Sequence, residues 1–158
     1  MIIIGYPGIG KSTLAGRYKE YIDLESSNWN NPDNTKPDNW WWSYGKVAED
    51  LSRQGYRVFV SCHKEVQGYL QDSAEYVALC YPSPKLKEAW IKRLLDRYER
   101  TKLEKDINAL TNCVRSYSDQ IDALERNNFF THRIVLEDIN YTLDNEIDNL
   151  IWSESSEN

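Results

Sequence analysis

The 158-residue sequence lacks several features that would assign its class at once. It has no apolar run near the ~20 residues that a membrane-spanning helix needs. No block of Lys and Arg stands apart from acidic neighbours, and the net charge of −6 argues against broad nucleic-acid binding. Internal repeats and low-complexity segments are also missing. The remaining balance of apolar and charged residues is typical of a soluble globular protein.

Cysteine is scarce, and nothing in the sequence indicates export. Cys62, Cys80 and Cys113 are odd in number and form no CxxC pair, so neither a disulfide framework nor a zinc site is indicated. Cys62 and Cys80 fall in predicted strands, where a free cysteine packs as a small apolar residue. Met1 leads directly into residues 2–4 without a basic flank or a cleavage site, so we expect no signal peptide and a cytoplasmic location.

The chain does contain a regular alternation of strand and helix patterns, which we expect to form a single domain over residues 1–158. Strands are predicted at residues 2–4, 21–25, 57–62, 76–81 and 132–136. Helices are predicted at residues 11–20, 40–54, 64–71, 84–100, 107–124 and 143–151, with a frayed tail after residue 152. This order predicts an α/β fold whose parallel sheet is covered on both faces, with ligands at the carboxyl ends of the strands.

The segment Gly5–Ser12 fits the phosphate-binding pattern GxxxxGKS at all four fixed positions. It follows an apolar strand and precedes a helix, as the mechanism demands. Glycines let backbone amides approach phosphate oxygens, Lys11 reaches the terminal phosphates, and the Ser12 hydroxyl is suited to hold Mg²⁺. The alternative is a glycine turn that only caps a helix. The candidate phosphate-binding residues of the segment are Gly5, Gly8, Ile9, Gly10, Lys11 and Ser12.

Two carboxylates follow the second predicted strand. Asp23 and Glu25 alternate along the chain, so both side chains can point to one face. One could hold a Mg²⁺-bound water, while the other orients or deprotonates an acceptor hydroxyl, or binds a sugar hydroxyl if the acceptor is a phosphate. The alternative is a solvated strand end. The third strand ends at Ser61 and His63 without an acid, which shifts metal binding toward Asp23.

His63 and three arginines are further candidates. His63 could contact a phosphate or the substrate, although a lone histidine at a strand end is more often structural. Arg93, Arg97 and Arg100 share one helical face, where guanidinium groups beside a phosphate loop would neutralise charge during phosphoryl transfer. The alternative is a solvated face paired with nearby acids. We favour a catalytic role for Arg93 and Arg97.

Three consecutive tryptophans begin the second predicted helix. Trp40 suits the core, together with Tyr44 one turn later. Trp41 and Trp42 cannot face the same way as Trp40, so one of them is a candidate for stacking on a nucleotide base in the cleft after the second strand. Core packing is the alternative use of both rings.

Together these segments resemble the P-loop kinases of small metabolites, a group that includes nucleoside monophosphate kinases, shikimate kinase and gluconate kinase. The resemblance rests on the loop at residues 5–12, on Asp23-Leu24-Glu25, and on the Pro-Ser-Pro segment that precedes the arginine helix. More narrowly, residues 22–28 and 58–61 resemble nucleotide-kinase-like proteins of phages, which implies a host cytoplasm.

The resemblance implies a three-layer P-loop NTPase fold with strand order 2-3-1-4-5 and a helical lid at about residues 84–126. It also implies that Gly8, Gly10, Lys11, Ser12 and Thr13 bind ATP, that Asp23 and Glu25 serve Mg²⁺ or the acceptor, and that Arg93 and Arg97 belong to the lid. The Asp-Gly-x-Pro-Arg segment of adenylate kinases is missing from the sequence.

The expected activity is ATP-dependent phosphoryl transfer to a small-molecule acceptor, with a nucleoside or deoxynucleoside monophosphate as the first expectation. Another acceptor, such as a nucleoside, a sugar or a polynucleotide 5′ end, remains open. A nucleotide-binding interaction protein with little turnover is a third alternative, because the third strand lacks an acid.

Overall fold

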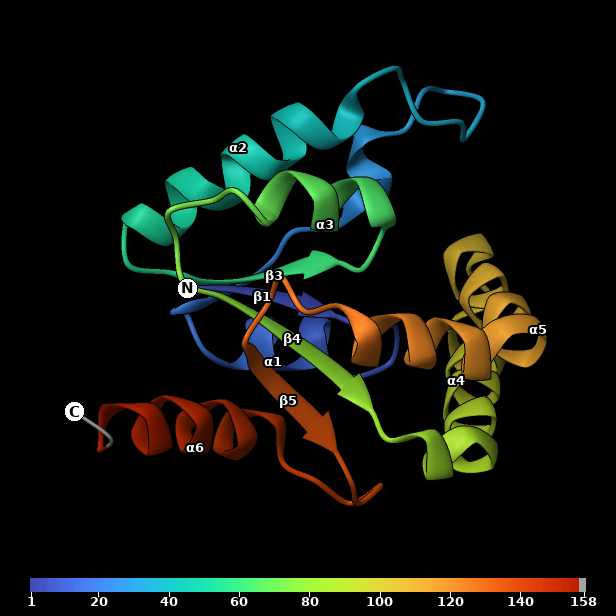
Figure 1. Ribbon diagram of the computed structural model, residues 1–158. Helices are drawn as coiled ribbons and strands as arrows, with labels where there is room; N and C mark the ends of the chain where they lie inside the picture. Colours follow the sequence, from blue (N-terminus) through green and yellow to red (C-terminus); the bar gives the residue numbers. More distant parts are fainter. Residues whose placement is uncertain (157–158) are drawn as a thin grey trace.

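Five short apolar segments form one parallel sheet in the computed structural model of the chain, which describes residues 1–156 (Figure 1). The strands are β1 (Ile2–Gly5), β2 (Tyr21–Asp23), β3 (Arg57–Ser61), β4 (Val77–Pro82) and β5 (His132–Leu136). Their order across the sheet is β2-β3-β1-β4-β5. The predicted α/β class, the parallel pairing and the strand order are therefore confirmed.

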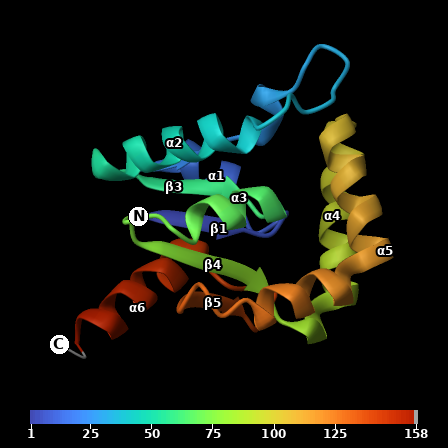
Figure 2. The same ribbon diagram turned by 45° about the horizontal axis from the view of Figure 1, so that its top comes forward.

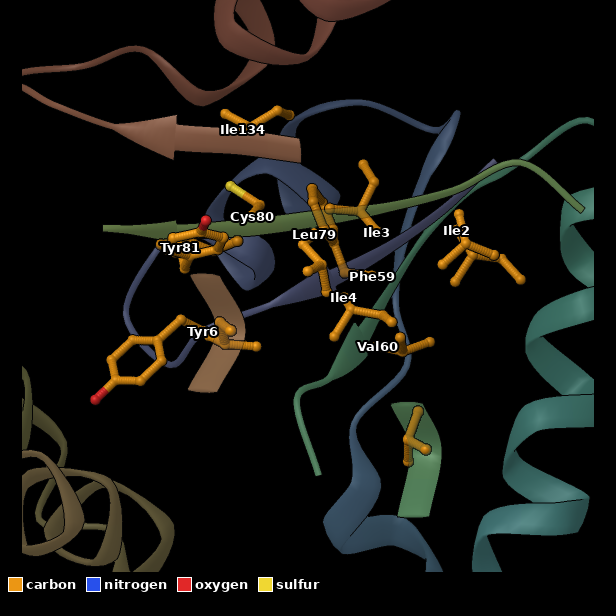
Figure 3. Packing of buried hydrophobic residues seen from close by; sticks show 14 of the residues in the cluster. Ile2, Ile3, Ile4, Tyr6, Phe59, Val60, Leu79, Cys80, Tyr81 and Ile134 are labelled. Atoms are coloured by element: carbon orange, nitrogen blue, oxygen red, sulfur yellow. The ribbon is translucent and has the colours of Figure 1, made fainter. Parts of the chain in front are cut away.

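Strand β1 lies at the centre of the sheet and of the core. Ile3 pairs with Phe59 of β3 on one side and with Ala78 of β4 on the other. All four residues of β1 are buried, because helices cover both faces of the sheet (Figure 3). This double burial explains why β1 has a continuous apolar sequence instead of an alternating one.

Four helices form the outer layers. They are α1 (Lys11–Arg17), α2 (Trp40–Arg53), α3 (Lys64–Leu70) and α6 (Leu143–Ser155). Helices α2 and α3 lie together on one face of the sheet, with α1 and α6 on the other (Figures 1 and 2). Right-handed crossovers require this division, since α1 connects β1 to β2 in one direction while α2 and α3 return in the opposite direction. Within the described residues, no helix has both the length and the apolar composition of a membrane span.

Two long helices, α4 (Lys87–Thr101) and α5 (Glu104–Arg126), form a hairpin beyond the carboxyl ends of the strands (Figure 2). A short 3₁₀ turn, Pro84–Leu86, leads from β4 into α4. Lys102 turns the chain between the helices with a φ of 54°. The hairpin occupies the region 84–126 where the sequence predicts paired helices, and it leaves the apolar side chains of Leu95 and Val114 exposed.

Several element boundaries differ from the predicted ones. Helix α1 ends at Arg17, three residues early, because Tyr18 adopts an extended backbone that lets Tyr21 pair with Arg57. Strand β3 ends at Ser61, so Cys62 lies beyond the strand and is only partly buried. Cys80 and Cys113 are buried as free thiols.

The C-terminal helix is longer than the sequence predicts. Helix α6 continues through Ser155, so the frayed tail predicted after Trp152 is wrong for residues 153–155, and residues 157–158 lie outside the described part. Glu154 holds the last turn, since it accepts hydrogen bonds from Tyr76 and from His132 Nδ1, the latter at 2.6 Å. These contacts join distant parts of the chain and leave no periodic signal in the local sequence.

The packing of α2 against α3 predicts opposite changes in the free energy of unfolding for two glycine-to-alanine substitutions. A Cβ on Gly45 would lie 2.3 Å from the Tyr69 ring, whereas a Cβ on Gly68 of α3 would meet nothing within 4 Å. We expect Gly45→Ala to lower the free energy of unfolding by about 1–3 kcal/mol through overpacking. Gly68→Ala should instead raise it by up to about 1 kcal/mol through helix propensity. Urea denaturation of both variants checks this; equal effects of the two substitutions would contradict the packing.

Candidate functional site

A cleft of about 410 Å³ opens between the carboxyl edge of the sheet and the α4–α5 hairpin. Most of the candidate residues from the sequence line it, although they come from six different elements and loops. They are Gly8, Gly10, Lys11, Ser12, Thr13, Asp23, Glu25, His63, Arg93, Arg97 and Arg100. The cleft therefore brings together the glycine loop, both carboxylates and all three arginines.

The glycine loop, residues 5–12, adopts a backbone that only glycine accommodates well. Gly8 and Gly10 have φ angles of 92° and 111°, in the left-handed region. A Cβ on Gly8 would also lie 2.9 Å from Leu94 and 3.1 Å from Trp90. Within the described residues, the following loop amides donate to no protein acceptor: Gly8, Gly10, Lys11, Ser12 and Thr13. These residues line the cleft, so an anion there would meet unpaired N–H donors.

Three side chains hold the opposite side of the loop. Each donates a hydrogen bond to a loop carbonyl: Trp90 Nε1 to Pro7 at 2.8 Å, Arg93 Nη1 to Gly8 at 3.3 Å and Tyr141 Oη to Ile9 at 2.5 Å. The bound carbonyls of Pro7 and Ile9 belong to the same peptide units as the amides of Gly8 and Gly10, so these two amides point away from the anchoring side chains, whereas the Ile9 amide donates to the carbonyl oxygen of Tyr6 at 3.4 Å. Ile9 itself is buried and contributes packing and its carbonyl, and it does not line the cleft.

The loop also positions its lysine. Lys11 Nζ donates to the carbonyl oxygen of Gly5 at 3.1 Å, which folds the side chain over the loop. A Cβ on Gly5 would lie 2.6 Å from Ile9 and 3.1 Å from the Lys11 side chain, so a larger residue would displace both. An ammonium group held by one neutral carbonyl retains two further N–H donors for an anion.

The two carboxylates differ in their electrostatic surroundings. Burial raises the pKa of Asp23, and the nearby charge of Lys11 only partly offsets this effect. Burial also acts to raise the pKa of Glu25, but the Lys105 ammonium, 3.2 Å from Glu25 Oε2, outweighs it and lowers the pKa. Asp23 therefore lacks a cation in direct contact, whereas Glu25 already has one.

The arginines have different partners from those expected. Arg93 donates to Gly8 and, at 2.9 Å, to the carbonyl oxygen of Ile139, so it braces the loop from below. Arg97 forms an ion pair with Asp106 of α5, with Nη2 2.6 Å from Oδ1. Arg100 lines the cleft. Arg97 and Arg100 are consequently the arginines of α4 that are not bound to the loop.

Asp106 ties the two helices of the hairpin together. Its carboxylate is 1% exposed and accepts hydrogen bonds from Arg97 Nε at 2.7 Å and from the Thr101 hydroxyl. Burial acts to raise the pKa of Asp106, but the bonds from Thr101 and Arg97 outweigh it and lower the pKa. A buried carboxylate needs such partners to remain charged, and in return it orients the Arg97 guanidinium toward the cleft wall.

Two contacts connect the hairpin tip with the opposite rim of the cleft. Asn34 Nδ2, in the polar loop before α2, donates to Glu104 Oε2 at 3.2 Å, and Lys105 pairs with Glu25 as described above. The same rim carries Lys36, which donates to the carbonyl oxygen of Ser26 at 2.8 Å. The tip of α4–α5 thus lies against the rim instead of standing free in solvent.

His63 lies at the floor of the cleft, where the chain leaves β3. Its Nδ1 is 2.7 Å from the Ser61 hydroxyl, and its ring packs edge-on against Trp40 at 5.1 Å between centroids. Burial, followed by the charge of Lys36, lowers the pKa of His63. A neutral imidazole in this position is suited to hydrogen bonding and not to ion pairing with a phosphate.

Trp41 and Trp42 do not line the cleft, so their predicted stacking on a substrate base is not supported by this geometry. Trp41 turns toward α3, where its ring lies 6.2 Å from that of Tyr69. Trp42 is 51% exposed beneath the Lys46 ammonium. Successive helical residues are ~100° apart, so of the three tryptophans it is Trp40 that points to the core, together with Tyr44 one turn later, as predicted.

The described residues contain no cluster of three or more His, Cys, Asp or Glu that would bind a metal alone. Ser12 and Asp23 do line the same cleft and supply a hydroxyl and a carboxylate. Mg²⁺ in proteins is typically bound by one or two such groups plus phosphate oxygens and waters. The donor set therefore fits Mg²⁺ that arrives with a phosphate ligand.

Several residues of the site escaped sequence reasoning. They are Trp90 and Tyr141 beneath the loop, Asp106 in the hairpin, and Lys36, Lys105, Asn108 and Asn112 along the cleft. The spacing of Asp106 to Arg97 spans a turn and carries no motif. Comparison with models of known protein families gives no match, and comparison with curated proteins gives none either. Function is therefore inferred from the site itself.

The Asp106 pair generates a pH prediction. Its pKa in the folded state lies below the unfolded value of about 3.9, so its contribution to stability is present above that pH and lost as the pH falls through the folded pKa. Asp106→Asn should lower the free energy of unfolding at pH 7 by about 1–3 kcal/mol. This difference from wild type should shrink as the pH approaches 3. Denaturation at several pH values checks it, with exposed Asp119→Asn as control; a difference that does not change with pH would contradict it.

Proposed function

We propose that this protein is an ATP-dependent phosphotransferase with a P-loop kinase fold. The observation that carries the proposal is the set of unpaired amides of Gly8, Gly10, Lys11, Ser12 and Thr13, residues that line the cleft, while side chains behind the loop bind the carbonyls of residues 7–9. Such a backbone nest, preceding a helix at the carboxyl edge of a parallel sheet, is suited to a polyphosphate. The sheet order and the position of the hairpin agree with this fold.

The residues divide the binding of the donor among them. Amides of the loop would hold the inner phosphates, and the Lys11 ammonium would contact the terminal ones. Ser12 and Asp23 would hold Mg²⁺, which supplies charge neutralisation on the transferred phosphoryl group. Arg97 and Arg100 of the lid hairpin would stabilise that group from the opposite wall, while Arg93 keeps the loop in shape.

The charge of the cleft favours an anionic acceptor. Six cationic side chains line it against only two carboxylates: Lys11, Lys36, Arg93, Arg97, Arg100 and Lys105 against Asp23 and Glu25. A triphosphate held by the glycine loop and Lys11 would not need the further cations Lys36, in the loop before α2, and Lys105, at the hairpin tip. A nucleoside monophosphate, which brings its own phosphate, therefore fits better than a neutral nucleoside or sugar.

A nucleotide-binding protein with little turnover is a second candidate function. Strand β3 ends at Ser61 without a carboxylate, and Arg93 is bound to the loop. On this alternative ATP would stabilise the fold, but no acceptor would accelerate ADP formation. A coupled assay with ATP, Mg²⁺ and a panel of nucleoside monophosphates, sugars and oligonucleotide ends separates the two. ADP formation with one acceptor supports the transferase, and silence across the panel together with an ATP-induced rise in melting temperature supports the alternative.

Removing the loop lysine should abolish transfer while the fold remains. We expect Lys11→Ala to lower kcat/KM by at least about a hundredfold, since Lys11 is the only ammonium in the glycine loop. Its melting temperature without ligand should stay near that of wild type, because Lys11 lies outside the buried core. Lys19→Ala, at an exposed position, serves as control. Retained activity in Lys11→Ala would overturn the assignment of the loop.

The Asp23 carboxylate should affect the reaction rate by binding Mg²⁺. Asp23→Asn is expected to lower kcat by about tenfold to a hundredfold and to raise the Mg²⁺ concentration for half-maximal rate. Initial rates across a Mg²⁺ titration measure both effects, with exposed Glu20→Gln as the matched control. An unchanged Mg²⁺ dependence would return Asp23 to a structural role.

A further inference from the structure

A second cavity of about 500 Å³ continues the cleft on the other side of Lys11. The two cavities share part of their walls: Pro7, Lys11, Ser61, His63, Ala109 and Asn112. The second one, here called the inner lobe, extends between the beginning of the glycine loop, α3 and α5. Gly10, Ser12 and Thr13 line the first cavity but not the inner lobe. A phosphate chain bound along those residues would therefore end at Lys11, where the inner lobe begins.

The walls of the inner lobe differ in chemistry from those of the phosphate cleft. Tyr6, Pro7 and Leu124 supply apolar surface. Among the described residues 1–156, the charged groups in the lining are Lys11 and Lys64, and no carboxylate is among them. One face of α5 forms the outer wall. The residues on that face are Ala109, Asn112, Gln120 and Ala123, spaced by three, eight and three positions, so that the two carboxamides lie between two alanines along the helix. Ala109 and Ala123 leave the space that the lobe occupies.

Two carboxamides of this wall have unused hydrogen-bonding groups. Gln120 Oε1 accepts from the Tyr6 hydroxyl at 2.8 Å, which leaves the Gln120 amide free. Within residues 1–156 the side chain of Asn112, which lies in the middle of α5, makes no hydrogen bond to another residue. Gln67, by contrast, is held at both ends of its carboxamide: its Nε2 donates to the Cys62 carbonyl at 2.8 Å and its Oε1 accepts from Asn127 at 2.9 Å, so its orientation in the wall is fixed by the protein.

These observations describe a site for a flat, uncharged ring with polar edges. Apolar walls would contact its faces, and a carboxamide offers one donor and one acceptor to its edge, which matches the hydrogen-bonding pattern of nucleobases. A cavity of this size and lining lies within the range of small-ligand sites. Because the Lys11 ammonium lies at the mouth of the inner lobe, the ligand should carry an anionic group next to its uncharged ring.

We propose that the inner lobe binds the base of the acceptor nucleoside monophosphate, with Asn112 and Gln120 as the residues that select among bases. The inference rests on the proposed function. We assign this base to the acceptor nucleotide and not to ATP. The reason is that the inner lobe begins beyond the end of the glycine loop, where the terminal phosphate of ATP would lie. Tyr6 forms one wall and, through Gln120, holds α5 at the distance that the base requires.

Ala123→Leu fills the inner lobe without touching the phosphate cleft, because Ala123 lines only the former of these two cavities. Ser118→Leu, at an exposed position of the same helix, makes the same addition outside both. Calorimetric titrations with ADP–Mg²⁺, five nucleoside monophosphates and ribose 5-phosphate are made on wild type and both variants. Ribose 5-phosphate carries the anionic group without a base and so isolates the contribution of the ring.

We expect at least one monophosphate to bind wild type at least about tenfold more tightly than ribose 5-phosphate does. Ala123→Leu should remove that advantage and leave ADP affinity unchanged, whereas Ser118→Leu should behave as wild type. Asn112→Ala should change the order of preference among the five bases. If Ala123→Leu fails to fold, Gln120→Met tests the same wall by removing the carboxamide at similar length.

The other outcomes overturn the inference in recognisable ways. Equal affinities for monophosphates and ribose 5-phosphate mean that no base enters the lobe. Loss of ADP affinity in Ala123→Leu means that the lobe holds the donor base instead, and tighter binding of a 5′-phosphorylated oligonucleotide than of any mononucleotide means that the acceptor is a polymer. Absence of ADP binding to wild type contradicts the proposed function itself, which separates its failure from that of the inner lobe.

Discussion

The hydrogen bonds from Trp90, Arg93 and Tyr141 to the carbonyls of residues 7–9 are the interactions on which the rest of the site depends. A peptide unit whose carbonyl is bound on one side turns its amide to the other, and glycines at positions 8 and 10 allow the backbone to follow. Trp90 is fully buried, so one of these anchors belongs to the core. The conformation of the phosphate-binding loop thus depends on side chains behind it, of which Trp90 and Tyr141 do not line the cleft.

The α4–α5 hairpin is held firmly at its base, where Trp90 anchors the loop, and only weakly at its tip. At its base, the Tyr6 ring packs edge-on against Trp90 of α4 and against Tyr117 of α5, and Figure 3 shows this ring directed away from the sheet. At its tip, Glu104 and Lys105 make single, solvent-exposed contacts with the opposite rim. Exposed pairs contribute at most about 1 kcal/mol each. The hairpin is therefore expected to open at the tip and pivot near its base.

Much of the fold follows from local patterns. Continuous β-branched runs indicated buried parallel strands, and helical stripes indicated α2, α5 and α6, because burial imposes those periods directly. Boundaries were less accurate where distant pairing decides them, as at Tyr18 and Glu154. The loop and both carboxylates were found because GxxxxGKS and the strand ends are local signals. Asp106 and Tyr141 were missed, since each acts on a partner that only the folded chain brings near.

For the tryptophans and the arginines, the type and spacing of the residues did not predict the role of each side chain. Three adjacent tryptophans suggested a base platform, yet consecutive positions on α2 point to the core, to α3 and to solvent in turn. Arg93, Arg97 and Arg100 share a helical face and nevertheless differ in use, because only Arg93 lies beneath the loop and only Arg97 opposite Asp106. The helical period predicts that side chains lie on the same face of a helix, but the residues that each side chain contacts in the folded protein determine its role.

The cationic cleft lies in a protein whose overall charge is −6, and this contrast has a kinetic consequence. A small anion that reaches the mouth of the cleft is attracted by the six cations around it, while a long polyanion must also approach the acidic remainder of the surface. At physiological salt, exposed charges more than a Debye length of about 8 Å apart are largely screened from each other, so the fields of the cleft and of the distant surface act separately. The charge distribution would then make the association rate depend on the length of the ligand, with mononucleotides binding faster than polynucleotides. Added salt would change the two association rates in opposite directions.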